Sequence, residues 1–266
     1  MSDAPEPARA IEVLTEGDPP RVWSFIVTLF GDLAQGDGDK MSGRLLARMA
    51  EIAGLRPETV RVALHRLRKD GWIDSHRNGR RSLYALTDFG RGQSAAAATR
   101  IYAPRAPDPD SCTVLIADPN GAEDALADVA SRTDAVPLAS FALLVPAPVD
   151  SVEPGLLHLR AESARLPDWV RLRACPDDLA AAYDRLFARL RCVKRLAAPE
   201  AASLEGAVVR ALVVHSWRRV LLRHPDLPAA LYPADCKAGA CRAAVMDLLV
   251  RLPRVPLDRL EAEAAD

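Results

Sequence analysis

The stretch from Pro57 to Lys69 carries side chains suited to contacting DNA. Apolar residues recur at the i, i+3, i+4, i+7 spacing of a buried helix face: Val60, Ala63, Leu64 and Leu67. The rest of the predicted helix carries cations, hydrogen-bonding groups and one apolar side chain: Glu58, Thr59, Arg61, Val62, His65, Arg66 and Lys69. Such side chains can contact base edges and neutralise phosphates. A solvated charged surface is the alternative, and this helix alone leaves both open.

A predicted β-hairpin follows this helix and carries arginines at its tip. Residues 71–76 and 82–86 have the composition of strands, and Asn78-Gly79 between them favours a type I′ turn. Arg77, Arg80 and Arg81 crowd the turn, where an exposed cation contributes little to folding. Arginines in this position can contact a phosphate backbone or enter a minor groove.

The elements around the helix and hairpin follow the order of a winged helix-turn-helix domain. Helices are predicted over residues 22–33 and 41–53, and Gly54 is a good residue to end the second. Pro57 can begin the next helix, and Thr87 or Asp88 can cap a fourth one that runs to about residue 102. The complete set favours DNA binding, with a winged helix that docks on another protein as the alternative.

A net charge of −1 is not that of a typical nucleic-acid binder, but it is a cancellation. Residues 21–105 hold 15 basic and 8 acidic residues and have a net charge of +7. Residues 1–20 and residues 106–266 each have a net charge of −4. A basic block of this kind is the electrostatic signature of a protein that binds a phosphate backbone.

The remaining composition predicts a cytoplasmic protein with no membrane association. No apolar run approaches the length of a membrane span, and the acidic, proline-bearing start does not resemble a signal peptide. The 5 cysteines are odd in number and scattered, which suits a reducing compartment.

Proline-rich breaks predict a multidomain α+β chain. Residues 1–20 are expected to be an acidic flexible tail, residues 21–105 the winged helix, residues 110–175 a middle domain and residues 178–266 a helical domain. The middle domain is predicted to contain strands over 112–117, 138–145, 156–160 and 169–173 and a helix over 121–131. In the helical domain Tyr183, Phe187 and Trp217 suit a core, with a dimer interface as the alternative use.

Several segments together resemble one protein family. They are residues 59–72, 79–87, 28–32 and 101–104, and a second region over 215–219, 225–228 and 231–233. These segments look like the PaaX-type family, the repressors of the phenylacetic acid catabolon. The resemblance covers most of residues 21–250 and is specific at both ends and weak in the middle. Arg56 departs from the usual Ser-type helix cap, and His65 replaces a usually small residue, which implies a different operator sequence.

The resemblance implies a homodimeric bacterial repressor with a GntR-like winged helix. Its partner would be double-stranded operator DNA, and an acyl-CoA thioester, typically phenylacetyl-CoA, would release it. A central ferredoxin-like domain and a helical C-terminal domain are implied as well. Effector binding is expected between the middle and C-terminal domains, with candidate residues on one helix: His215, Trp217, Arg218 and Arg219. Arginines suit the phosphates of coenzyme A, although a structural or solvated charge cluster is the alternative.

The sequence predicts no catalytic residue, no metal and no cofactor, and therefore no enzyme. The central domain that the resemblance implies is similar to a small nuclease with a metal-binding aspartate where this chain has Asp118, so a metal-dependent nuclease is an alternative function. One carboxylate is a poor metal site, and a turn-forming aspartate explains it. Cys236, Cys241 and His224 have loosely zinc-like spacing but lack a fourth ligand, and redox sensing is the other use open to these cysteines.

Overall fold

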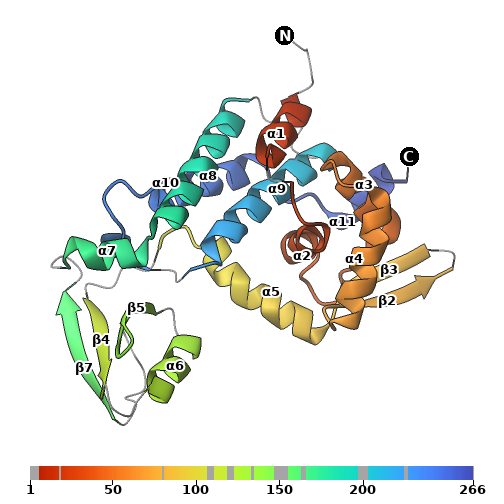
Figure 1. The fold of residues 1–266 in the computed structure, drawn as a ribbon. Helices are drawn as coiled ribbons and strands as arrows, with labels where there is room; N and C mark the ends of the chain where they lie inside the picture. The colour runs from red at the N-terminus through yellow and green to blue at the C-terminus, as the bar shows by residue number, and fades with distance from the viewer. Residues whose placement is uncertain are drawn as a thin grey trace. The chain divides into compact units, whose positions relative to one another are not determined.

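The structure is a computed structural model that combines helices with two small antiparallel sheets (Figure 1). It describes residues 6–17, 19–79, 81–106, 111–118, 123–132, 135–146, 155–162, 166–196, 203–224 and 227–265. The chain divides into two compact units. The first unit comprises residues 1–103, 186–219 and 243–266, and the second comprises residues 104–185 and 220–242.

The first unit contains the basic block. Its helices are α2 (Val22–Leu33), α3 (Gly43–Ile52), α4 (Pro57–Lys69) and α5 (Asp88–Ile101). Its sheet has the order β1-β3-β2, built from β1 (Met41–Ser42), β2 (Ile73–Asn78) and β3 (Arg81–Leu86). The predicted helices and hairpin are present, and the two-residue strand β1 is an addition that the sequence pattern did not indicate.

The beginning of the chain corrects one expectation. Residues 6–15 form helix α1 (Glu6–Thr15) rather than a flexible tail. Ala10 and Leu14 lie four residues apart on one helix face and are buried. The side chain of Arg189 donates a hydrogen bond to the carbonyl of Glu16 just beyond the helix end. The acidic segment is therefore amphipathic, and burial of its apolar face favours the helix.

A long apolar helix, α9 (Leu204–Leu221), runs through the core of the first unit. Its residues 207–215 are all buried, as expected for a helix that is apolar around most of its circumference. The neighbouring helices α8 (Asp177–Arg195) and α10 (Ala238–Arg251) contribute residues to both units, and α11 (Leu257–Glu263) ends the chain.

The second unit contains a four-stranded antiparallel sheet. Its order is β5-β6-β4-β7, made from β4 (Ser111–Ala117), β5 (Val136–Ala139), β6 (Ala142–Pro146) and β7 (Leu156–Glu162). Helix α6 (Glu123–Arg132) supplies Leu126 and Val129 to a core with Leu115 and Leu143. Burial of Leu115 and Ala117, two positions apart on β4, places the apolar side chains of one sheet face in this core.

Two strand predictions in the second unit are wrong. Residues 138–145 are not one strand, because the chain turns at Ser140 and Phe141 between β5 and β6. Residues 169–173 belong to helix α7 (Asp168–Ala174). Val170 and Ala174 are its buried residues, four apart, and Asp168 supplies the negative charge that a first helical turn favours. The short helix η2 (Ala229–Leu231) follows later in the chain.

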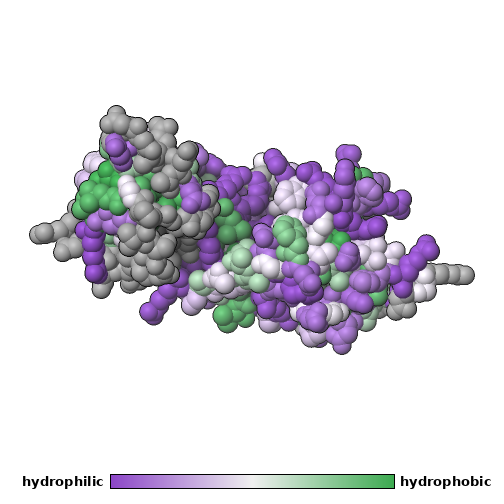
Figure 2. Space-filling view, turned by 90° about the horizontal axis from the view of Figure 1, so that it is seen from below, coloured by the Kyte–Doolittle hydropathy of each residue, from purple (hydrophilic) through white to green (hydrophobic). Residues whose placement is uncertain are grey.

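The surface seen in Figure 2 is predominantly hydrophilic, with hydrophobic residues in separate patches. Within the described residues, no helix is both long enough and apolar enough to cross a membrane.

Candidate nucleic-acid interface

Helix α4 separates its residues into a buried face and an exposed face. Val60, Ala63, Leu64 and Leu67 are buried, as their spacing predicts. The predicted DNA-contacting residues of the helix are all exposed: Glu58, Thr59, Arg61, Val62, His65, Arg66 and Lys69. Val62 is 71% exposed. Exposure of an apolar side chain to water is unfavourable, but it would suit contact with a thymine methyl group.

The two ends of α4 have different electrostatic properties. Pro57 begins the helix, and the preceding Arg56 makes no side-chain cap, as the departure from a Ser-type residue predicts. Uncapped amides at a helix start can bind an anion such as phosphate. At the other end Arg66 lies 3.5 Å from the Asp70 carboxylate and 5.9 Å from the centre of the Trp23 ring. Arg66 is therefore held over α2 and is less free to reach outward than Arg61.

The β2–β3 hairpin carries the predicted arginines, with a register that differs by one residue from the expected turn. Asn78 pairs with Arg81 and Arg77 with Ser82, so Asn78 belongs to strand β2 rather than to the turn. Gly79 follows with a φ of +60°, a backbone conformation that glycine adopts without steric cost. Arg77 and Arg81 are exposed, and Arg80 lies outside the described residues.

A groove of about 640 Å³ lies between α4 and strand β3. Arg61 and Glu58 line it from α4, and Arg81 and Tyr84 line it from β3. Arg44, at the start of α3, adds a third cation. The structure therefore brings part of the predicted helix face and one predicted hairpin arginine to a common concave surface.

Helix α11 forms the remaining wall of this groove. The sequence alone did not indicate that this helix would lie here. The Glu261 carboxylate accepts a hydrogen bond from the Ser42 amide at 2.6 Å, and Arg44 donates to the carbonyl of Ala265. Glu263 accepts from the amide of Leu204 at the start of α9. The end of the chain thus holds α3 and α9 through side-chain hydrogen bonds. Its acidic composition was the available signal, but the Ser42–Glu261 contact joins positions 219 apart.

Two of the four candidate effector residues are structural in the first unit. His215 is 2% exposed, and its Nδ1 lies 3.1 Å from the Thr28 hydroxyl. Trp217 is 1% exposed, and its indole N–H donates to the Ile101 carbonyl at 3.0 Å. These contacts join α9 to α2 and α5, and they leave neither side chain on a ligand-accessible surface.

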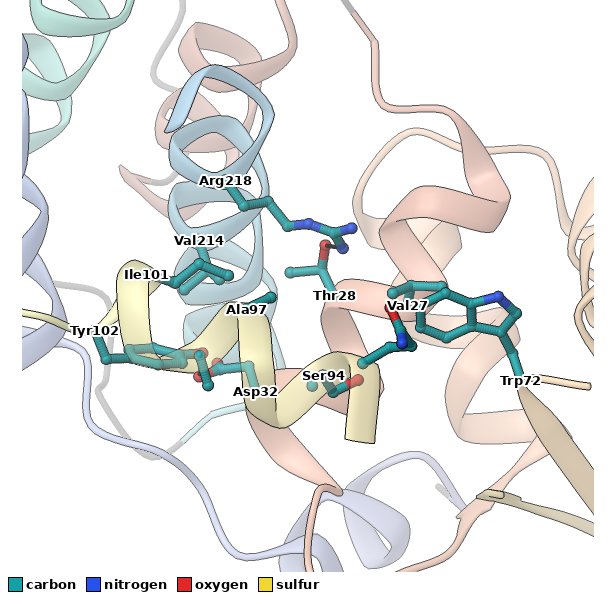
Figure 3. A pocket seen from close by; sticks show the side chains of 13 residues that line it. Val27, Thr28, Asp32, Trp72, Ser94, Ala97, Ile101, Tyr102, Val214 and Arg218 are labelled. Atoms are coloured by element: carbon teal, nitrogen blue, oxygen red, sulfur yellow. Dashed lines mark hydrogen bonds between the residues drawn. The ribbon is translucent and has the colours of Figure 1, made fainter. Parts of the chain in front are cut away.

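Arg218 lines a small cavity between α2, α5 and α9 (Figure 3). Its side chain extends from α9 toward Thr28, whose hydroxyl accepts a hydrogen bond at 2.9 Å. Burial lowers the pKa of the Arg218 guanidinium. The cavity holds about 50 Å³, room for a few water molecules rather than for a coenzyme. Arg219 is half-buried and does not line it.

Asp32 and Tyr102 border the same cavity. The Tyr102 hydroxyl donates to an Asp32 carboxylate oxygen at 2.7 Å. Burial, together with the charge of Asp32, raises the pKa of Tyr102 above its usual value. Tyr102 therefore stays a neutral donor at physiological pH, and it ties the end of α5 to α2.

The candidate metal residues do not assemble into a metal site. Among the described residues, no group of three histidine, cysteine or acidic side chains is placed to hold an ion. Asp118 lies exposed just beyond β4. The Sγ atom of Cys236 lies 3.4 Å from that of Cys175, and His224 shares a hydrogen bond of 2.6 Å with the Tyr183 hydroxyl. The contact between Cys175 and Cys236 spans 61 positions, so spacing along the chain did not indicate it.

Comparisons with known proteins show which family the chain resembles. A family described as PaaX-like protein matches residues 21–90, and one described as PaaX-like protein C-terminal domain matches residues 176–255. The chain is 28% identical over 254 residues to the transcriptional repressor PaaX of Escherichia coli (strain K12), across 86% of this chain and 79% of that protein. It also resembles the solved structure of the uncharacterized protein Rv0674 from Mycobacterium tuberculosis. That match has a TM-score of 0.51 and 21% identity and covers 90% of this chain and 96% of the other, a level that shows the fold alone.

Proposed function

Because the chain belongs to the PaaX-like protein family, which comprises non-enzymatic transcriptional regulators that bind DNA, we propose that it represses transcription by binding operator DNA through α4 and the β2–β3 hairpin. In this proposal residues 21–103 form a winged helix-turn-helix, α4 is the recognition helix and the hairpin is the wing. A bacterial repressor of this kind acts in the cytoplasm, where the chromosome lies.

One observation carries the proposal: Glu58 and Arg61 from the exposed face of α4 and the hairpin residue Arg81 border one concave surface. Arg61 and Arg81 come from different elements and line the same groove. Folding alone does not require two cations there, because exposed charges contribute little to stability. A duplex with phosphates along both edges of its major groove would supply partners for these arginines. Glu58, Val62 and His65 are then the residues that would contact base edges.

We further propose that two copies bind DNA together. A dimer places two recognition helices about one helical turn apart, so the operator would contain two related half-sites. The proposed target is a catabolic operon, as the sequence resemblance implies. The second unit is proposed to be ferredoxin-like, because its first strand, β4, lies centrally between the third and fourth, β6 and β7.

The proposed effector is an acyl-coenzyme A thioester of the phenylacetyl-CoA kind. Of the four candidate residues, Arg218 and Arg219 retain partly accessible side chains at the end of α9. The cavity beside Arg218 is too small for coenzyme A, so the helices around it would have to separate to admit even an acyl group. A ligand that binds the opened form would shift the equilibrium away from the DNA-binding form.

A salt titration tests DNA binding. The probe is the duplex upstream of the chain's own gene, and the measurement is fluorescence anisotropy at several salt concentrations. For the wild type, the logarithm of the association constant is expected to fall linearly with the logarithm of salt. In the double variant Arg77→Ala/Arg81→Ala the slope is expected to fall by about 0.9 per lost phosphate contact.

Arg48→Ala is the matched control, because Arg48 is exposed on α3, pairs with Glu51 and does not line the groove. Its affinity and salt slope are expected to match the wild type. Absent or salt-independent binding, or an equal loss in the control, contradicts the proposal. Effector release is tested by adding phenylacetyl-CoA, with free coenzyme A as the control ligand. A DNA complex that withstands saturating thioester contradicts the effector proposal and leaves DNA binding intact.

A further inference from the structure

Two cysteines of the second unit lie side by side although 61 positions separate them in the sequence. The Sγ atoms of Cys175 and Cys236 are 3.4 Å apart, and both residues are free thiols. Cys175 ends helix α7 and is 1% exposed. Cys236 lies between η2 and α10 and is partly exposed. Cys236 is therefore the residue of the pair that a reagent in solution can approach, and Cys175 is in contact with it.

The backbone holds both residues in place. The Cys175 amide donates to the Arg171 carbonyl at 2.9 Å, and the Cys236 amide donates to the Pro233 carbonyl at 3.0 Å. The Arg171 side chain also donates to the carbonyl of Ala230 in η2. The segments that carry the two thiols are therefore linked independently of the sulfurs. Such a link keeps the thiols close to each other in the reduced protein.

The environment of Cys236 favours a thiolate. The Cys175 thiol hydrogen bond and the Ala238 amide lower the pKa of Cys236 to about 7, against opposing effects of burial, Asp235 and Asp184. The pKa of Cys175 is raised, chiefly by the same hydrogen bond and by burial. A thiolate is the nucleophilic form of cysteine, so the accessible member of the pair is also the activated one.

We propose that Cys175 and Cys236 form a reversible thiol–disulfide site that reacts with hydroperoxides, in which Cys236 attacks the peroxide and Cys175 completes the disulfide. The sulfurs need to approach from 3.4 Å to the roughly 2.05 Å of a disulfide bond. That approach is small enough for side-chain rotation and modest movement of the loop before α10.

The chemistry balances with hydrogen peroxide as oxidant. The Cys236 thiolate attacks one peroxide oxygen, the O–O bond breaks, and the products are a Cys236 sulfenic acid and hydroxide, which takes up a proton as water. The Cys175 thiol then attacks the Cys236 sulfur. The S–S bond forms, the S–O bond breaks, and the sulfenic oxygen leaves as water with the thiol proton. Two thiols lose two electrons in total, and one peroxide gains them. Two equivalents of an external thiol reverse the change.

None of the other described cysteines combines solvent exposure with a second thiol in contact. Cys112 and Cys241 are wholly buried. The thiol of Cys112 donates to the Ala161 carbonyl, and that of Cys241 donates to the Tyr183 carbonyl. Burial raises the pKa of Cys241 to about 12, which disfavours its thiolate. Cys192 is exposed on α8, and no cysteine contact is recorded for it in the described part of the chain. Cys192 is therefore the internal control for simple accessibility.

Peptide mass spectrometry of the full-length reduced protein tests the proposal. After brief treatment with hydrogen peroxide and alkylation of remaining thiols, a peptide pair that joins Cys175 to Cys236 is expected in the wild type and in Cys192→Ser. It should disappear with dithiothreitol. Cys175→Ser is expected to accumulate a Cys236 sulfenic acid that dimedone traps, and Cys236→Ser to leave Cys175 reduced.

The rate of oxidation separates this site from unspecific damage. Cys236 is expected to react about tenfold faster than the more exposed Cys192. Absence of the joined peptide, or faster loss of Cys192 than of Cys236, overturns the proposal. Circular dichroism of both near-isosteric serine variants is the folding control, and only variants with the wild-type spectrum are compared.

Discussion

Arg210 and Asp32 form a bidentate ion pair inside the first unit, although 178 positions separate them. The Arg210 Nε lies 2.7 Å from Asp32 Oδ2 and its Nη2 lies 2.9 Å from Oδ1. The side chains are 6% and 0% exposed. Arg210 also donates to the carbonyls of Leu249 and Leu252 at the end of α10. One arginine on α9 therefore joins α2, the first helix of the proposed DNA-binding domain, to the end of α10.

Asp32→Asn is expected to destabilise the protein by about 3–5 kcal/mol, because it leaves the buried Arg210 charge without its partner. The measurement is the free energy of unfolding from a urea titration. Glu51→Gln is the control, since the Arg48–Glu51 pair is exposed at both ends and such pairs contribute about 0–1 kcal/mol. Equal effects of the two variants would show that the buried pair contributes no more than the surface pair.

Gly90→Ala is expected to destabilise the protein, and Gly92→Ala to stabilise it by about 0.5–1 kcal/mol. A Cβ atom at Gly90 would lie 2.2 Å from the backbone oxygen of Trp72, so α5 and the chain before β2 would have to separate. A Cβ atom at Gly92 on the same helix meets nothing within 4 Å. Thermal unfolding of the two variants should move in opposite directions, and a rise in Tm for Gly90→Ala would disprove the close approach.

His65→Ala is expected to change which operator sequences are bound, because we propose that the exposed imidazole contacts base edges. Lys69→Ala is expected to weaken binding to all sequences by a similar factor, as loss of a phosphate contact does. Affinities for a set of single-base operator variants distinguish the two outcomes. The assignment of His65 fails if its variant weakens every operator equally.

Alkylation of Cys236 by iodoacetamide is expected to accelerate as pH rises through about 7, where its thiolate forms. Cys175→Ala removes the hydrogen bond that lowers this pKa, so the midpoint should move to higher pH. The rate is read from peptide mass spectrometry between pH 5.5 and 9, a range chosen to bracket about 7. An unchanged midpoint in Cys175→Ala would mean that the Cys175 contact does not lower the pKa.

The lowered pKa of Cys236 also predicts how the stability of the reduced protein changes with pH. The folded-state pKa of Cys236 lies below the reference value of 9.0, so the unfolded chain binds more protons between pH 7 and 9. Stability from this thiol is present above the unfolded value and is lost as pH falls through about 7. The raised pKa of Cys175 has the opposite effect. The stability that this thiol contributes is lost as pH rises above 9.0.

Local sequence patterns predicted the first unit well, because its elements carry strong independent signals. Helix α4 has a complete apolar stripe, a proline at its first turn and basic residues in its last. The hairpin was visible from Gly79 and its flanking strands, although the turn differs by one residue. In the second unit, apolar and polar residues alternate over 169–173, as they do in a strand. The helix is apparent only from the burial of Val170 and Ala174, which lie four residues apart.

Long-range pairing could not be predicted from one sequence. Asp32 looks like an ordinary acidic residue at the end of an apolar helix, and its partners Arg210 and Arg254 lie 178 and 222 positions away. Cys236 was grouped with Cys241 for the same reason, while its contact is Cys175. His215 and Trp217 were considered for a ligand, because sequence does not distinguish a buried hydrogen-bonding residue from an exposed one.

The hydrogen bond from the Ser42 amide to Glu261 makes the start of α3 depend on a distant segment of the chain. Ser42 and Glu261 are 219 positions apart, and Arg254 reaches Asp32 across 222 positions. Contacts of such sequence separation form slowly, because the long loop between the partners must close first. We therefore expect α2 and the start of α3 to reach their final packing late in folding, after the local helices have formed.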